Sequence, residues 1–211
     1  MPRSARGGYT LAELLVAMAI GLIVLVVVGA FFSTSLSAYQ RVASRRDLQA
    51  SITTTLARMA AELRASSLQT LTLASADATY PTMMAFRTQR SEGTASTSFV
   101  PATEFIVYFL DSEGQWVRKT WSNGAGGLLF APDPVVTGQR LTLDQALRIT
   151  QVPNGSERTL VRGVTALVLT PASFPTTEMV DTLGIRMTAR HALDSSAIGD
   201  TFSTSVAMRN L

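Results

Sequence analysis

The chain has 211 residues, and 18 basic against 15 acidic side chains give a formal net charge of only +3. It has no cysteine and a single histidine, His191, which excludes disulfides, thiolate nucleophiles, cysteine metal sites and any site that needs two histidines. The charges are interspersed, so no segment has the composition of a nucleic-acid-binding arm or an acidic tail.

The most apolar segment runs from Leu11 to Phe32 and contains one charge, Glu13. Its length of about 22 residues is enough to cross a hydrocarbon layer of about 30 Å as a helix. Arg3 and Arg6 precede it, and the segment just after it is uncharged. The positive-inside rule then keeps the N-terminus in the cytoplasm and predicts a single-pass protein whose C-terminal domain lies outside.

An ordinary cleaved secretory signal fits this segment poorly, because such signals have apolar regions of about 7–15 residues followed by a small-residue cleavage site. Here the small pair Gly7-Gly8 precedes the apolar run, so a cut after Gly8 would leave the whole helix on the mature chain. A carboxylate in a membrane helix costs roughly 2.5–3.5 kcal/mol at the centre. Glu13 therefore needs a partner, and an amine freed at Tyr9 would lie about one helical turn away.

Residues 8–17, GYTLAELLVA, resemble the cleavage and methylation signature of type IV prepilins and pseudopilins. The resemblance implies that prepilin peptidase cuts after Gly8, that Tyr9 becomes the methylated N-terminus, and that Glu13 pairs with a neighbouring N-terminus during assembly. Tyrosine stands where phenylalanine is usual and keeps the aromatic ring. The resemblance also implies a filament core packed by apolar residues of the helix, including Leu11, Leu14, Leu15, Ile20 and Leu22.

The helical pattern continues beyond the apolar segment, with apolar residues at spacings of three and four from Leu48 to Leu63. No proline interrupts the chain from Tyr9 to about Leu71. One helix of roughly 60 residues, about 90 Å long, is therefore expected. Its second half carries a single apolar stripe, which must lie against something.

Strand patterns follow Ala74. Glu104–Leu110 is predicted to be a central strand, Asp111–Gly114 a turn and Gln115–Trp121 the hairpin partner. Short links favour an antiparallel sheet laid on the apolar stripe of the helix. Further strands are expected at Leu147–Gln151, Leu160–Val161, Val164–Thr170, Leu183–Arg190 and Phe202–Met208.

The predicted fold class is α+β, a long N-terminal helix packed against a C-terminal antiparallel β-sheet domain. Its expected parts are a leader peptide, residues 1–8, and a transmembrane or filament-core helix, residues 9–33. An amphipathic continuation of the helix, residues 34–72, and a globular β-rich domain, residues 73–211, follow.

No residue pattern predicts catalysis, a cofactor or a metal. The glycine-rich segment 122–127 lacks the lysine of a phosphate loop, and the aspartates are too scattered for a calcium loop. Trp116 and Trp121 fall on opposite faces of one strand, so one is expected in the core and the other against a neighbouring subunit. His191 is expected at the surface.

The sequence predicts a minor type IV pilin-like structural subunit, processed by prepilin peptidase and assembled into a pilus or priming it. Residues 46–64 resemble PilW-like minor pilins and also the J-type minor pseudopilins, and the C-terminal residues 206–210 resemble the closing strand of PilW-like proteins. The PilW-like features favour the pilus. A minor pseudopilin of a type II secretion system, a pilus-tip adhesin or DNA-uptake subunit, and a signal-anchored periplasmic enzyme remain alternatives.

The resemblance to pilins implies several partners. They are prepilin peptidase, other major and minor pilins, and the lipid of the bacterial inner membrane before assembly. The final location is then the pilus or a periplasmic pseudopilus. The near-neutral exported part gives DNA binding no support.

Overall fold

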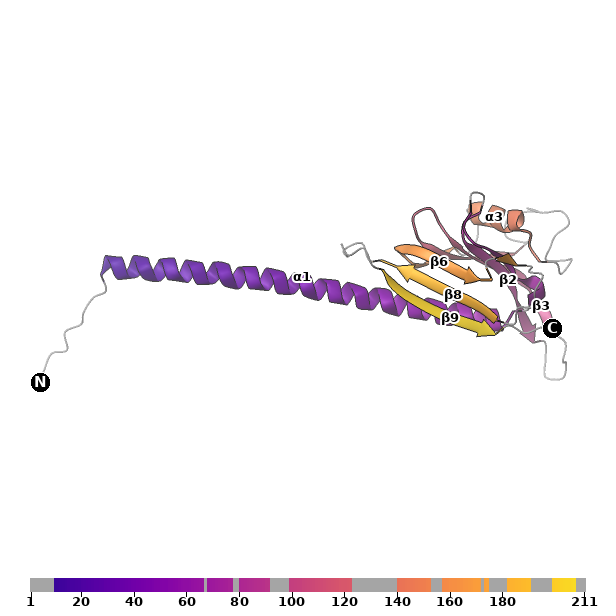
Figure 1. Cartoon of the computed structure of the whole chain (residues 1–211), viewed down its shortest axis with the longest axis horizontal. Coiled ribbons are helices and arrows are strands. Elements are labelled where there is room, and N and C mark those ends of the chain that lie inside the picture. The colour runs from indigo at the N-terminus through magenta and orange to yellow at the C-terminus, as the bar shows by residue number, and fades with distance from the viewer. Residues whose placement is uncertain are drawn as a thin grey trace, which may run out of the picture. The chain divides into compact units, whose positions relative to one another are not determined.

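The computed structural model describes residues 10–66, 68–77, 80–91, 99–122, 140–152, 157–171, 173–174, 182–190 and 199–207. The chain divides into two compact units, residues 1–44 and 45–211, each treated by itself below. One helix, α1 (Leu11–Arg64), contributes residues to both (Figure 1). The strands confirm the predicted α+β class, because they form antiparallel sheets that follow the long apolar helix.

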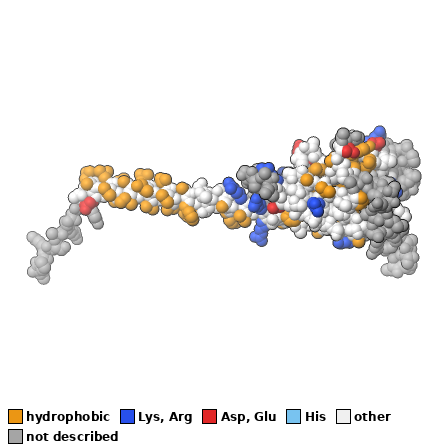
Figure 2. All heavy atoms as spheres, viewed as in Figure 1, with side chains coloured by type: hydrophobic (Ala, Val, Ile, Leu, Met, Phe, Trp, Pro, Cys, Tyr) orange, Lys and Arg blue, Asp and Glu red, His pale blue; other side chains and the backbone are white. Residues whose placement is uncertain are grey.

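In the first unit, α1 exposes its apolar side chains. Its large hydrophobic residues from Leu11 to Val42 are between 46% and 78% exposed. They gather along the N-terminal part of the helix in Figure 2. This helix is long and apolar enough to cross a membrane, as the sequence predicts.

In the second unit, α1 buries the stripe that the three-and-four spacing predicts: Leu48, Ile52, Leu56, Met59 and Leu63. The helix ends at Arg64 rather than near Leu71. Ser66 leaves the helical path, because its Oγ donates to the Leu63 carbonyl (2.7 Å) and its backbone bridges to Thr88. A 3₁₀ turn, Leu68–Thr70, and β1 (Thr72–Ala74) follow.

The larger sheet has six strands in the order β5-β4-β3-β2-β1-β7. All its pairs are antiparallel. The predicted central strand 104–110 is confirmed, since β3 (Phe99–Leu110) lies between β2 (Met83–Ser91) and β4 (Trp116–Ser122). The outer strands are β5 (Arg158–Val161) and the two-residue β7 (Ser173–Phe174). Strands β1, β2 and β7 were not predicted from the sequence.

The β3–β4 turn is also confirmed. Asp111 Oδ1 accepts hydrogen bonds from the backbone N–H groups of Glu113 (2.9 Å) and Gln115 (2.7 Å). Gly114 has a φ of +71°, a conformation that favours glycine, and the Val164 carbonyl would touch any added Cβ.

The remaining strands form a second sheet, where a single sheet was expected. Its order is β6 (Val164–Thr170), β8 (Thr182–Ala189) and β9 (Asp200–Ala207), all antiparallel. The inward residues of β8 alternate strictly, as predicted for this segment. Both sheets contribute to one core cluster with the buried stripe of α1.

The predicted strand Leu147–Gln151 is wrong, because this segment is the second half of helix α3 (Leu143–Gln151). Thr142 and Gln145 form a capping box, in which each side chain accepts a hydrogen bond from the other residue's backbone N–H. Ala146 and Ile149 are buried, so helical burial outweighs the β-branched character of the segment.

A second core cluster lies beneath α3, which packs Ala146 and Ile149 together with Phe105, Val107 and Trp121 of β3 and β4. Trp116 belongs to the other cluster, beside α1. The two tryptophans therefore occupy separate cores, but both are at most 2% exposed. This corrects the expectation that one of them faces a neighbouring subunit.

Candidate functional site

The N-terminus of α1 is closed by Thr10 and Glu13. Glu13 Oε2 accepts hydrogen bonds from the Thr10 backbone N–H (2.9 Å) and hydroxyl (3.0 Å). Thr10 Oγ1 accepts in return from the Glu13 backbone N–H (3.3 Å). This reciprocal arrangement is a capping box, which satisfies N–H groups that a helix start otherwise leaves without partners.

This role of Thr10 was not predicted from the sequence, which suggested a partner for Glu13 only at Tyr9. The signal was present as a threonine followed three residues later by a glutamate at the start of an apolar run. Because Thr10 follows the expected cleavage position, the box does not depend on the leader. Glu13 Oε1 has no hydrogen-bond partner among the described residues. Gly8 and Tyr9 lie outside the described residues.

Five residues are expected to pack a filament core, and the structure places all of them on the exposed part of α1. Each is more than half exposed: Leu11, Leu14, Leu15, Ile20 and Leu22. An apolar surface of this extent is typical of a segment that contacts lipid or other proteins. Their neighbours in an assembly remain a prediction.

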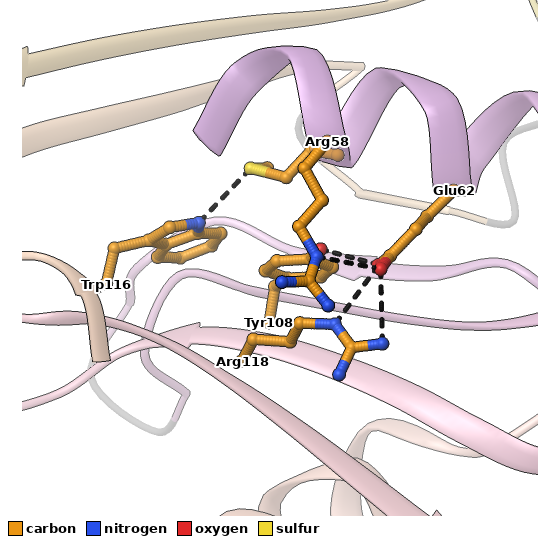
Figure 3. Close-up of polar contacts among 6 residues, drawn as sticks. Arg58, Glu62, Tyr108, Trp116 and Arg118 are labelled. Atoms are coloured by element: carbon orange, nitrogen blue, oxygen red, sulfur yellow. Dashed lines mark hydrogen bonds and ion pairs between the residues drawn. The ribbon is translucent and has the colours of Figure 1, made fainter. Parts of the chain in front are cut away.

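A polar cluster around Glu62 joins α1 to the larger sheet of the second unit (Figure 3). Tyr108 Oη donates to Glu62 Oε2 at 2.6 Å, and Arg118 Nε donates to the same oxygen at 3.2 Å. Arg58 Nε reaches Oε1 at 3.1 Å, and Arg118 Nη2 reaches it at the same distance. Beside the cluster, Trp116 Nε1 donates to Met59 Sδ.

The carboxylate of Glu62 is the centre of charge in this cluster. Burial opposes its ionisation, but the hydrogen bonds from Tyr108, Arg118 and Arg58 outweigh it and hold its pKa below the ordinary value. Burial and the bond to Glu62 raise the pKa of Tyr108, which therefore stays a donor. The cluster fixes α1 to β3 and β4, and nothing in it is arranged for group transfer.

Lys119, the only lysine of the chain, is 1% exposed and was given no role by the sequence analysis. Its Nζ donates to the carbonyls of Thr150 and Val152 at the end of α3, and Glu157 Oε2 lies 3.4 Å away. A cation at a helix C-terminus is favoured because the last carbonyls carry partial negative charge. Lys119 thus holds α3 to the sheet.

Among the described residues, no three His, Cys, Asp or Glu side chains are grouped so that they could hold a metal ion. The glycine-rich residues 123–127, His191 and the C-terminal residues 208–211 lie outside the described part of the chain. The described sites therefore consist of a capped apolar helix and two structural polar clusters.

The start of the chain matches a known family model, the prokaryotic N-terminal methylation motif. The match covers residues 3–29, and so includes Gly8, Tyr9 and Glu13. The chain carries a prepilin-type processing motif. Comparisons with curated proteins and with solved structures gave no match.

The motif supports a type IV pilin-like or pseudopilin subunit, a class that is structural rather than catalytic. Proteins with this motif are substrates of prepilin peptidase, and pilins assemble with other pilins. The exposed apolar helix that follows Glu13 is consistent with anchoring in the inner membrane.

Proposed function

We propose that the protein is a minor type IV pilin, cut after Gly8, methylated at Tyr9 and assembled into a pilus or needed to start one. The observation that carries this proposal is the motif at residues 3–29 on a helix whose large apolar side chains are exposed in the described part of the first unit. The PilW-like features of residues 46–64 favour a minor subunit.

Successive segments of the chain have different proposed roles. Residues 1–8 are the leader, 9–33 the membrane and later filament-core helix, and 34–64 the amphipathic continuation, since α1 ends at Arg64. Residues 73–211 form the domain outside the cytoplasm. Leu11, Leu14, Leu15, Ile20 and Leu22 pack against the equivalent helices of other subunits.

Assembly is proposed to pair Glu13 with the Tyr9 ammonium of a neighbouring subunit. The capping box uses only one carboxylate oxygen, Oε2, so Oε1 is available to a cation. In the bilayer a carboxylate without a cation is costly, whereas in the filament each added subunit supplies an ammonium group. This difference favours ordered addition of subunits.

The test uses Glu13→Ala beside Glu113→Ala, a matched loss of one carboxylate at an exposed position of the β3–β4 turn. Glu13→Ala is expected to insert into the membrane and be cleaved, but to disappear from the sheared filament fraction. Immunoblots of the membrane and filament fractions measure both steps. Incorporation of Glu13→Ala at the parental level would contradict the pairing.

The machine served by the subunit is tested by deleting the gene and complementing it. Loss of surface pili with secretion intact is the result expected for a pilus subunit. Normal pili with blocked secretion would assign the protein to a type II secretion pseudopilus. Normal pili and normal secretion would contradict an essential role in assembly and point to an adhesive role at the tip.

A further inference from the structure

A groove of about 320 Å³ lies on the second unit between α1 and β5. Its α1 wall runs from Ala50 to Arg58, and its β5 wall is formed by Arg158, Thr159 and Leu160. The Ser51 hydroxyl donates to the Leu160 carbonyl at 3.0 Å and joins the two walls. Hydroxyl groups and two guanidinium groups therefore line an open cavity.

Positive charge is in excess beside this groove. Arg118 of β4 stands directly opposite Arg158 of β5 in the strand register. Directly opposed like charges destabilise a strand pair by a few tenths of a kcal/mol to about 1 kcal/mol. Glu62 binds Arg118 and Arg58, so one carboxylate serves two of three guanidinium groups.

Arg158 is the remaining cation. Its side chain has no hydrogen bond or ion pair with any described residue and is exposed on the edge strand β5. Its neighbour Glu157 is engaged elsewhere, with Lys119. Arg58 uses only Nε toward Glu62, and its terminal nitrogens have no hydrogen-bond partner among the described residues, so they can donate to a ligand in the groove.

We propose that the groove binds the carboxylate of an Asp or Glu side chain from a neighbouring pilin-like subunit. A guanidinium fork matches a carboxylate with two parallel hydrogen bonds, and the groove hydroxyls add donors. The bound carboxylate would neutralise Arg158 and remove the cost of the Arg118–Arg158 pair. The inference rests on the proposed function, because it needs a neighbouring subunit.

Charge reversal tests the contact in the whole chain, in cells that assemble filaments. Arg158→Glu is expected to lower incorporation into the filament fraction about tenfold, the effect of about 1.4 kcal/mol. Arg158→Lys keeps the charge and should retain most incorporation. The matched control is Arg186→Glu, which reverses an exposed arginine on β8, remote in sequence from the groove. Equal incorporation of Arg158→Glu and Arg186→Glu would overturn the proposal.

The absence of cysteine allows a direct second measurement. Thr54→Cys introduces one thiol at the groove, which can be labelled with a benzophenone maleimide and irradiated in cells. We expect a cross-linked product with another pilin-like subunit, lost when Arg158→Glu is added. Cross-linking to lipid alone, or a product that persists in the double variant, would contradict the inference.

Failure of the groove and failure of the function give different results. If the Glu13→Ala variant is lost from the filament fraction while the Arg158→Glu variant is retained in it, the groove proposal fails and the proposed pilin function stands. If the unaltered chain is never found with filaments, the proposed function fails first.

Discussion

The first part of α1, up to residue 44, and its last part, from residue 45, differ in what contacts their apolar side chains. In the first, Ile23 is 64% exposed, whereas in the second, Ile52 is fully buried. The same residue type on one helix therefore belongs to two environments. The surrounding pattern tells them apart, since the first part is apolar all round as far as Phe32 and the second has one apolar stripe.

The two parts of α1 require different surroundings for their apolar side chains. A helix that is apolar on every side needs a surrounding of lipid or protein, which the rest of this chain does not supply to the described residues of the first unit. A helix with one stripe is completed by a sheet from its own chain. Folding of the chain therefore buries the apolar side chains of the second part. Those of the first part must be covered by membrane insertion or by assembly with other subunits.

The largest effect is expected from a matched pair of substitutions. Ile52→Ala leaves a cavity in the core and should lower the free energy of unfolding by about 2–5 kcal/mol. Ile23→Ala should leave the unfolding of the domain unchanged, because that side chain is 64% exposed and belongs to neither core cluster of the described residues. Urea titration of the full chain in detergent, followed by fluorescence of the buried Trp116 and Trp121, measures both. If Ile23→Ala and Ile52→Ala lowered the free energy of unfolding equally, the two parts of α1 would not differ in the way described.

The next effect concerns the polar contact that holds the second part of α1 to its sheet. Glu62→Gln leaves Arg58 and Arg118 without their carboxylate and should cost roughly 2–3 kcal/mol of unfolding free energy. Glu113→Gln changes an exposed carboxylate in the β3–β4 turn and should cost less than about 0.5 kcal/mol. The same urea titrations decide whether the two variants differ.

The pH dependence of stability follows from the same carboxylate. The pKa of Glu62 in the folded chain lies below the ordinary value of 4.5, so folding favours the ionised form. Its stabilising contribution is present above pH 4.5 and is lost as the pH falls through the lower, folded pKa. Glu62→Gln should therefore show a shallower loss of stability in acid than the unaltered chain; parallel curves would exclude Glu62 as a source of the acid response.

The smallest effect is expected at the start of α1. Thr10→Val removes the capping hydroxyl and should destabilise the first turn by about 1 kcal/mol. Amide hydrogen exchange at Leu11–Leu14 should then be about fivefold faster in detergent micelles. Thr10→Ser retains the hydroxyl and serves as the control, and unchanged exchange in Thr10→Val would argue against the capping box.

The elements that the sequence predicts well are those with a strong local pattern. The stripe of α1 from Leu48 to Leu63 and the β3–β4 hairpin depend on spacing and turn chemistry, which act over a few residues. Asp111 and Gly114 determine the turn through their own hydrogen bonds and backbone angles. The motif around Glu13 was recognisable for the same reason.

Other features depend on contacts between distant residues and could not be predicted from local patterns. The split into two sheets and the second core beneath α3 require knowledge of which strands pair. Lys119 shows the same limit, because its partners, Thr150 and Val152, lie about thirty residues further along the chain. The wrong prediction of a strand at Leu147–Gln151 could have been avoided, since Thr142 and Gln145 have the sequence pattern of a capping box at a helix start.

Mass spectrometry of the native N-terminus is the direct test of prepilin-type processing. We expect that the chain purified from filaments or membranes begins at Tyr9 and carries one methyl group on its amine. A Gly8→Val variant should remain uncut and serves as the control. A native chain that begins at its original N-terminus, or that is cut after the apolar segment, would show that the protein is not processed as a prepilin.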